Sequence, residues 1–173
     1  ELPAFYTRES GLGVDARVDT PEDLAAMFQA QRDLGLKTGM LVTNPIPQQY
    51  AMDKAVIDKA IEEFGRIDAV VNNAQASASG VTIADHTMDQ FNLAIYSGLY
   101  ATYLYMQKAY PHLKETKGSV VNFASGAGLF GNYGQCSYAA AKEGIRGLTR
   151  VAANEWGKDG INVNIVCPLA WTA

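Results

Sequence analysis

Residues 54–75, KAVIDKAIEEFGRIDAVVNNAQ, contain the pattern that decides the fold. Apolar side chains recur every three or four residues up to Phe64, which is the spacing of an amphipathic helix, and Gly65 is placed to end it. Residues 67–73, IDAVVNN, follow as an unbroken apolar run, typical of a parallel strand that is covered on both faces. The helical stripe consists of Val56, Ile57, Ala60, Ile61 and Phe64.

The rest of the chain repeats this alternation of strands and helices. The predicted class is therefore α/β, a three-layer sandwich with a five-stranded parallel sheet, either Rossmann-like or flavodoxin-like. We treat residues 1–173 as a single domain and expect the last three strands to be neighbours in the order of the sequence. The expected strands are 2–6, 39–45, 67–73, 118–125 and 161–167, and the expected helices are 20–35, 52–64, 87 toward 111, and 138–156.

Composition excludes several classes of function. A formal net charge of −4 and a pI near 5.1, without a basic stripe, argue against a nucleic-acid or anionic-membrane partner. Cys136 and Cys167 match no metal-ligand or redox spacing, so we expect no metal and two reduced thiols in a cytoplasmic protein. The longest uncharged run, Phe91–Gln107, is shorter than the ~20 residues of a membrane span and predicts a buried helix.

One helix combines residues that suit proton transfer. In YAAAK, Tyr138 and Lys142 are four residues apart and so share a helix face. A nearby ammonium favours the phenolate form of a tyrosine. Ser125 stands at the expected end of the fourth strand, where its hydroxyl could hold a substrate carbonyl.

The same Tyr-x-x-x-Lys spacing occurs twice more, at Tyr50/Lys54 and Tyr110/Lys114. Neither pair has a serine at a strand end upstream. For both we favour the simpler interpretation of a surface tyrosine and a solvated lysine.

GRIDAVVNNA, KGSVVNFASGAG and YAAAKEGIRGLTRVAANEWGKDGINVNIVCP together resemble the short-chain dehydrogenase/reductase family over residues 63–173. The resemblance implies that Tyr138 is the general acid/base, that Ser125 polarises the substrate carbonyl and that Lys142 binds the nicotinamide ribose of NAD(P). It places Asn73 near the adenosine side of the cofactor and Pro168 beside the nicotinamide. A cap at the strand end is an equally good interpretation of Asn73.

The resemblance also implies a homodimer formed through the Phe91–Gln107 helix and the Tyr138–Trp156 helix. Three features depart from the family pattern. Gln75 replaces the glycine of NNAG, and Gly98 stands where a helix normally offers a catalytic asparagine. PLAWTA replaces the usual PG and the substrate-binding segment that follows it.

Residues 1–62 resemble another family. ELPAFYTRESGLGVDARVDTPEDLA and LGLKTGMLVTNPIPQQYAMDKAVIDKAIEE are similar to a stretch of pseudouridine monophosphate glycosidases, and no catalytic residue of that family is carried over. GLGVDA, residues 11–16, matches a phosphate-binding pattern, but its glycines do not lead directly into a helix, so we interpret it as a loop. Arg8, Ser10 and Arg17 are either remnants of a phosphate-facing loop or solvated loop side chains.

We therefore expect a folded chimera, joined inside a shared helix, which points to an engineered protein. We expect this chimera to have no competent active site and to bind no cofactor tightly, because the phosphate loop and the substrate lid are missing. One alternative is a residual NAD(P)-dependent oxidoreductase of the short-chain type that acts on a carbonyl or alcohol. Another is a module that binds a small phosphate or a nucleotide.

Overall fold

The computed structural model describes residue 29 and residues 49–168 of the chain. The expected strands at 2–6 and 39–45 lie outside the described residues, and so does most of the expected helix 20–35. Gln29, the described residue of that helix, is helical.

Three parallel strands form the described sheet. They are β1 (Ala69–Asn72), β2 (Ser119–Phe123) and β3 (Asn162–Val166), in the order β1-β2-β3. In the register, Asn72 pairs with Asn122 and Val120 pairs with Val163. The prediction that the last three strands are neighbours in the order of the sequence is confirmed, and the architecture is that of a Rossmann-like α/β fold.

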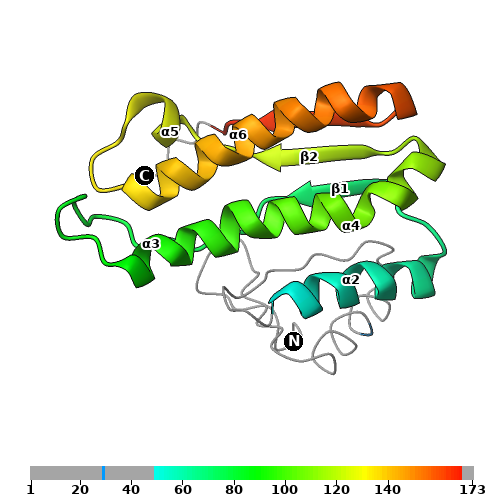
Figure 1. The fold of residues 1–173 in the computed structure, drawn as a ribbon, viewed down its shortest axis with the longest axis horizontal. Coiled ribbons are helices and arrows are strands. Elements are labelled where there is room, and N and C mark those ends of the chain that lie inside the picture. Colours follow the sequence, from blue (N-terminus) through cyan, green and yellow to red (C-terminus); the bar gives the residue numbers. More distant parts are fainter. Residues whose placement is uncertain (1–28, 30–48, 169–173) are drawn as a thin grey trace.

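Helices alternate with these strands and cover one face of the sheet. Helix α4 packs on β1 and β2, α6 packs on β2 and β3, and α2 packs on α4. Figure 1 shows α4 and α6 side by side, with α2 on the other flank of α4. The helical elements are α2 (Gln49–Phe64), α3 (Met88–Ala94), the π-helical turn η2 (Ile95–Tyr100), α4 (Ala101–Thr116), α5 (Gly126–Phe130), α6 (Cys136–Trp156) and the 3₁₀ turn η3 (Gly157–Asp159).

The helix expected from Thr87 toward Pro111 is longer and less regular than predicted. Thr87 and Gln90 form the expected capping box at its start. The helix then widens into η2 and continues as α4 past Pro111 to Thr116. The last turn is stabilised because Leu113 is fully buried and because Thr116 Oγ1 donates to the Ile67 carbonyl at 2.8 Å.

Strand β1 is less covered than its apolar sequence predicts. Its residues alternate between exposed and half-buried, and Val71 is 62% exposed. The described helices cover the face toward which Val70 and Asn72 point, so Val71 lies on the opposite face. The expectation of a strand covered on both faces is therefore wrong for the described part of the chain.

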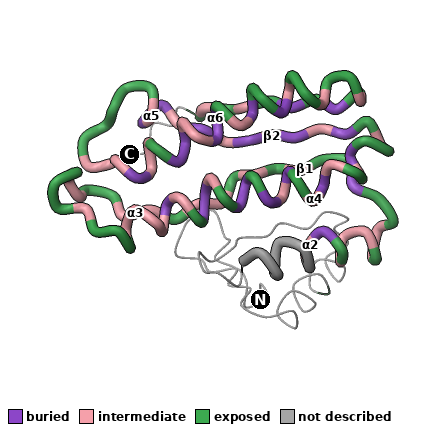
Figure 2. The backbone as a smooth tube through the Cα atoms, in the orientation of Figure 1, coloured by how far each residue is buried: buried purple, intermediate pink, exposed green. Residues whose placement is uncertain are grey.

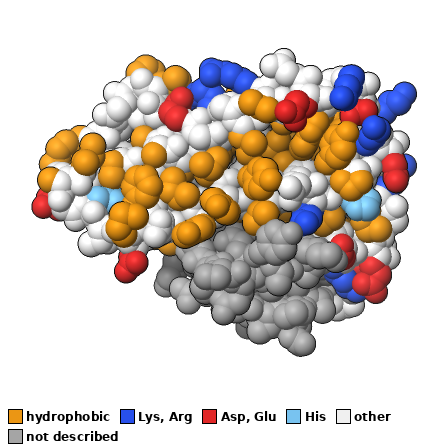
Figure 3. Space-filling model, in the orientation of Figure 1, with side chains coloured by type: hydrophobic (Ala, Val, Ile, Leu, Met, Phe, Trp, Pro, Cys, Tyr) orange, Lys and Arg blue, Asp and Glu red, His pale blue; other side chains and the backbone are white. Residues whose placement is uncertain are grey.

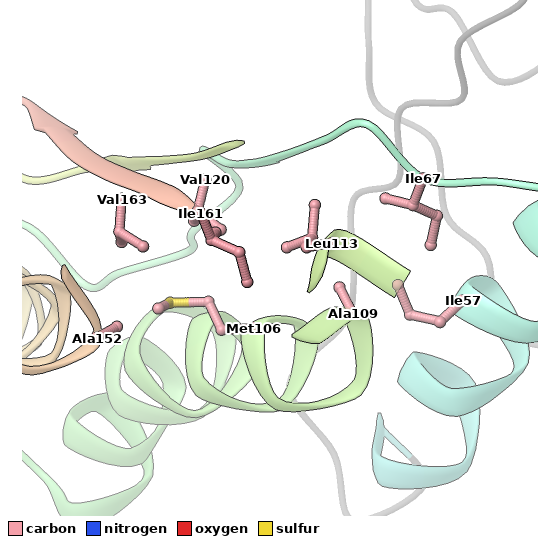
Figure 4. Close-up of a cluster of buried hydrophobic side chains, with 9 residues drawn as sticks. All are labelled: Ile57, Ile67, Met106, Ala109, Leu113, Val120, Ala152, Ile161 and Val163. Carbon is pink, nitrogen blue, oxygen red and sulfur yellow. The ribbon is translucent and has the colours of Figure 1, made fainter. Parts of the chain in front are cut away.

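One hydrophobic cluster joins the helices to the sheet. Figure 4 shows Ile57 of α2 beside Ala109 of α4, Leu113 of α4 next to them, and Val120 of β2 further along the cluster, beside Ile161. Ile57 belongs to the predicted α2 stripe, and Ala60 and Ile61 of that stripe pack against the cluster as partly buried residues. Figure 2 shows the buried positions concentrated along the inner sides of α4, α6 and β2. The full cluster is Ile57, Ile67, Met106, Ala109, Leu113, Val120, Ala152, Ile161 and Val163.

A buried amide connects four of these elements. Asn122 of β2 is completely buried, and its Nδ2 donates to Thr149 Oγ1 of α6 at 2.9 Å and to Met106 Sδ of α4 at 3.2 Å. Its Oδ1 accepts from Asn72 Nδ2 of β1 at 2.8 Å. A buried polar group is costly unless it is paired, and here both ends of the amide are paired.

Replacing Asn122 by alanine should lower the free energy of unfolding by roughly 2–4 kcal/mol. The change removes three hydrogen bonds and leaves the Asn72 amide without its acceptor in the interior. Urea unfolding of Asn122→Ala measures this loss. Asn164→Ala, an exposed position on β3, is the control and should change stability by no more than about 0.5 kcal/mol. Equal losses in the two variants would contradict the assignment.

Candidate functional site

Three of the predicted site residues follow the carboxyl ends of three adjacent strands. Asn73 comes directly after β1, Ser125 follows β2 by two residues, and Pro168 follows β3 by two residues. Asn73 and Pro168 are exposed at this edge. In open α/β sheets ligands bind in the crevice outside this edge, so the topology brings the predicted residues to one place.

Ser125 is held on both sides by local hydrogen bonds. It is the N-cap of α5, and its hydroxyl oxygen accepts from the Ala127 amide at 3.1 Å. Its carbonyl accepts from Arg146 Nη2 at 3.4 Å, and Arg146 is itself paired with Glu143 at 2.9 Å. A hydroxyl that accepts one bond can still donate its own proton. Ser125 is therefore a fixed group with a proton to offer.

Tyr138 and Lys142 lie on the same face of α6, as their spacing predicts. The Lys142 ammonium is 5.5 Å from the centroid of the Tyr138 ring. It donates to the carbonyl of Phe123, the last residue of β2, at 2.8 Å. Phe123 stands two residues before Ser125 in the sequence. The structure thus brings Tyr138 and Lys142 together at the end of the strand that leads to Ser125.

Lys142 carries its charge in a buried position. Lys142 as a whole residue is only 3% exposed. Burial penalises the charged form and lowers the pKa of Lys142 to about 8, while the nearby Cys167 thiol acts in the opposite direction. A lysine with such a pKa can change its protonation near neutral pH, which is typical of functional sites.

The second Tyr-x-x-x-Lys pair has a structural role. Tyr110 Oη donates to Asp159 Oδ2 at 2.6 Å, and Lys114 Nζ pairs with Asp159 Oδ1 at 2.9 Å. The bond to Asp159 raises the pKa of Tyr110, opposite to what a phenolate base requires. The interpretation of a solvated lysine holds, since the Lys114 side chain is 54% exposed, but its ammonium also pairs with Asp159 and so links α4 to η3. Tyr50 and Lys54 both fall within α2, and their side chains lie outside the described residues.

A contact that the sequence did not predict joins His86 to Ser137, the residue before Tyr138. His86 Nε2 lies 3.0 Å from the hydroxyl of Ser137, which is almost completely buried and directly precedes Tyr138. The His86 ring also meets Phe91 edge-on, with 6.5 Å between ring centroids. Since a histidine and a serine 51 residues apart share no periodic pattern, the contact could be found only in the folded chain.

Two loops approach each other beside this site. The Gly80 amide donates to the Gly134 carbonyl at 2.8 Å, and Val81 forms an isolated parallel bridge with Gln135. Gly134 has a φ of +69°, and a Cβ there would lie 2.8 Å from the Gly80 Cα. Only glycine suits both the conformation and the close approach. The loop after β1 is thereby joined to the loop that leads into α6.

The low pKa of Lys142 should appear in the pH dependence of stability. Between pH 8 and pH 10.5 the unfolded chain binds more protons at this lysine than the folded chain does, so the free energy of unfolding rises with pH. This contribution should be roughly 2–3 kcal/mol over that range. Lys142→Met should lack the rise when both proteins are unfolded in urea at a series of pH values. Parallel pH profiles for the two proteins would show that Lys142 titrates normally.

Among the described residues, no helix has the length and apolar character needed to cross a membrane.

Comparison with known proteins gives a family match over most of the chain. The family model described as short chain dehydrogenase matches residues 8–172, a range that begins well before residue 63. A 12alpha-hydroxysteroid dehydrogenase from a Clostridium species is 62% identical over 152 residues, which are 87% of this chain and 59% of that protein. The crystal structure of a short chain dehydrogenase from Mycobacterium avium superposes with a TM-score of 0.69 at 30% identity, covering 87% of this chain and 53% of that one.

A second similarity covers a shorter segment. The pseudouridine-5'-phosphate glycosidase of Caldanaerobacter subterraneus is 59% identical over 63 residues, which are 36% of this chain and 20% of that protein. Both resemblances predicted from the sequence are therefore confirmed. The chain spans about three fifths of the length of the hydroxysteroid dehydrogenase and one fifth of the glycosidase.

Proposed function

The chain belongs to the short-chain dehydrogenase family, and from this membership we propose that it acts as an NAD(P)-dependent oxidoreductase that interconverts an alcohol and a carbonyl compound. The observation that carries the proposal is the Tyr138–Lys142 pair on one face of α6, fastened to the end of β2 beside Ser125. The 62% identity to a dehydrogenase supports this function over an inactive chimera and over a nucleotide-binding module.

The proposed roles follow from the chemistry of each side chain. In the reducing direction, the Tyr138 phenol gives its proton to the carbonyl oxygen, and the Ser125 hydroxyl donates a hydrogen bond to the same oxygen. The Lys142 ammonium stabilises the phenolate that remains. A nicotinamide cofactor, when bound, supplies the hydride in this direction and accepts it in the other.

The described residues fit the nicotinamide half of such a cofactor. The Lys142 ammonium has donors for ribose hydroxyls beyond the one that it gives to Phe123. Pro168, exposed after β3, lies at the same edge of the sheet, and Asn73, exposed after β1, lies on the side proposed for the adenosine. The GLGVDA segment, the nearest candidate for the phosphate half, lies outside the described residues.

For the substrate we propose a bulky apolar alcohol or ketone, of which a hydroxysteroid is an example. The similar Clostridium protein is named for a hydroxysteroid. In this chain, large apolar side chains are exposed on the two loops that meet at Gly80 and Gly134. Ile83 and Tyr133 lie on these loops, and Leu129 and Phe130 lie at the end of α5, which leads into the second loop.

The glycosidase-like segment 1–62 and the dehydrogenase-like segment 63–173 form, in our proposal, a single α/β domain. The contact of Ile57 with the main core supports it, because this residue of the first segment packs with Ala109 and Leu113 of the second.

Tyr138→Phe should lower turnover of a hydroxysteroid by a factor of roughly 10²–10⁴, because the ring remains but its proton is lost. Tyr110→Phe is the matched control, since it removes the same hydroxyl from a Tyr-x-x-x-Lys pair that binds Asp159. It should keep the rate of the unaltered chain. The absorbance of NADH or NADPH follows the reaction, and titration of cofactor fluorescence measures binding. Lack of saturable cofactor binding, or equal rates in both variants, would overturn the proposal.

We also propose that the chain forms a homodimer through α4 and α6. A hollow of about 410 Å³ lies between these helices, lined by apolar and aromatic side chains that include Tyr103, Leu148 and Trp156. Tyr100 and Val151 on the same surface are 52% and 53% exposed. Figure 3 shows apolar side chains gathered over α3, η2, α4 and α6. A contiguous exposed patch of this kind favours a protein partner, and a second copy presents the same surface.

Val151→Arg should convert the dimer to a monomer, because two guanidinium groups would face each other across the twofold contact without partners. Sedimentation velocity at micromolar concentration measures the mass. Ile83→Arg, which places the same charge on an exposed residue of another surface, should remain dimeric. A monomeric unaltered chain would rule the interface out.

A further inference from the structure

Gln75 and Gly98, two departures from the family pattern, are in contact. A Cβ at Gly98 would lie 2.5 Å from Gln75 Cδ and 2.6 Å from Gln75 Oε1. The carboxamide therefore occupies the volume that any side chain at position 98 would need. Gly98 lies in the π-helical turn η2, and turns of this type are frequent at functional sites.

Neighbouring residues hold the two segments together. The Ala76 amide donates to Ser97 Oγ at 3.0 Å, and Ser97 Oγ lies 3.1 Å from the Ala76 carbonyl and 2.6 Å from that of Leu93. Ser97 is almost completely buried. Gln75 thus contacts Gly98, and Ala76 bonds to Ser97. These two contacts fix the position of the Gln75 side chain.

The Gln75 carboxamide has one end without a partner. Its Nε2 donates to the Ala94 carbonyl at 3.4 Å, a long bond. Its Oε1 is buried, and no group in the described part of the chain donates to it. An unpaired buried acceptor destabilises the folded state, so a donor is needed at this position.

Lys142 has the kind of hydrogen-bond donor that Gln75 Oε1 needs. Its ammonium has three donors, and the bond to the Phe123 carbonyl uses one. Both groups belong to the same edge of the sheet: Gln75 stands three residues beyond Asn72, and the Phe123 carbonyl that holds the ammonium directly follows Asn122, the residue paired with Asn72. Helix α6 also touches η2 directly, since a Cβ at Gly144 would meet the Leu99 side chain at 2.7 Å.

We propose that a buried water connects the Lys142 ammonium to Gln75 Oε1, which makes Gln75 a positioning residue for the reaction centre. The water accepts from Nζ and donates to Oε1, so it supplies the bond that each group lacks, as buried waters do. Gly98 is required because only the absence of a side chain leaves room for the carboxamide. The role of Lys142 in the reaction rests on the proposed function, whereas the contact of Gln75 with Gly98 does not.

The titration of Lys142 tests this connection without substrate or cofactor. Gln75→Leu keeps most of the volume but removes the acceptor, so the charged amine loses support and its pKa should fall by on the order of half a unit. Gly98→Ala should have the same effect, because its Cβ displaces the carboxamide. Gln75→Glu should raise the pKa. NMR titration of the Lys142 side chain, assigned with Lys142→Arg, measures these shifts.

The other groups that face Lys142 are unchanged in these variants. They are the Tyr138 ring, the Cys167 side chain and the Phe123 carbonyl, and the Glu143–Arg146 pair lies further along its own helix. Gln107→Leu, at an exposed glutamine of α4 that bonds Tyr103, is the matched control and should leave the titration unaltered. An identical Lys142 pKa in the unaltered chain, Gln75→Leu and Gly98→Ala would overturn the proposal. Absence of turnover in the unaltered chain would count against the proposed function alone.

Discussion

The side-chain amide of Asn122 is the interaction on which the described structure depends. From the next-to-last residue of β2 it bonds to β1, α4 and α6, so these four elements meet at one buried polar group inside an apolar cluster. Apolar packing alone tolerates sliding of a helix along a sheet, since hydrophobic contacts have no direction. A fully paired buried amide adds direction and fixes the register of α6 against β2.

That register determines what α6 can offer at the edge of the sheet. Thr149, which meets Asn122, lies seven residues after Lys142, or about two turns along the same face. With Thr149 fixed, Lys142 reaches the Phe123 carbonyl and Arg146 reaches the Ser125 carbonyl. The same strand therefore anchors the core at one residue and the candidate site a few residues later, so the chemistry depends on a contact made in the interior.

The strands and the helix face of the candidate site could be predicted from the sequence, because both follow from the local spacing of residue types. The strands around Val70, Val120 and Val163 and the shared face of Tyr138 and Lys142 follow from spacing. The sequence did not reveal the π-helical turn, because IYSGLY has no pattern that separates it from an ordinary helix. Gln75 and Gly98 were noted as separate departures, and only the fold shows that one side chain fills the space left by the other. The binding of Tyr110 to Asp159 was hidden for the same reason.

The junction of Gly80 and Gly134 has a consequence for motion. A backbone hydrogen bond and a contact too close for any side chain couple the segment after Gln75 to the segment before Tyr138. Neither loop can swing outward without carrying the other or breaking this bond. Opening toward solvent therefore requires a concerted displacement of two chain segments, with hinges at four places instead of two. A displacement that moves two joined segments together is slower than the movement of a single free loop.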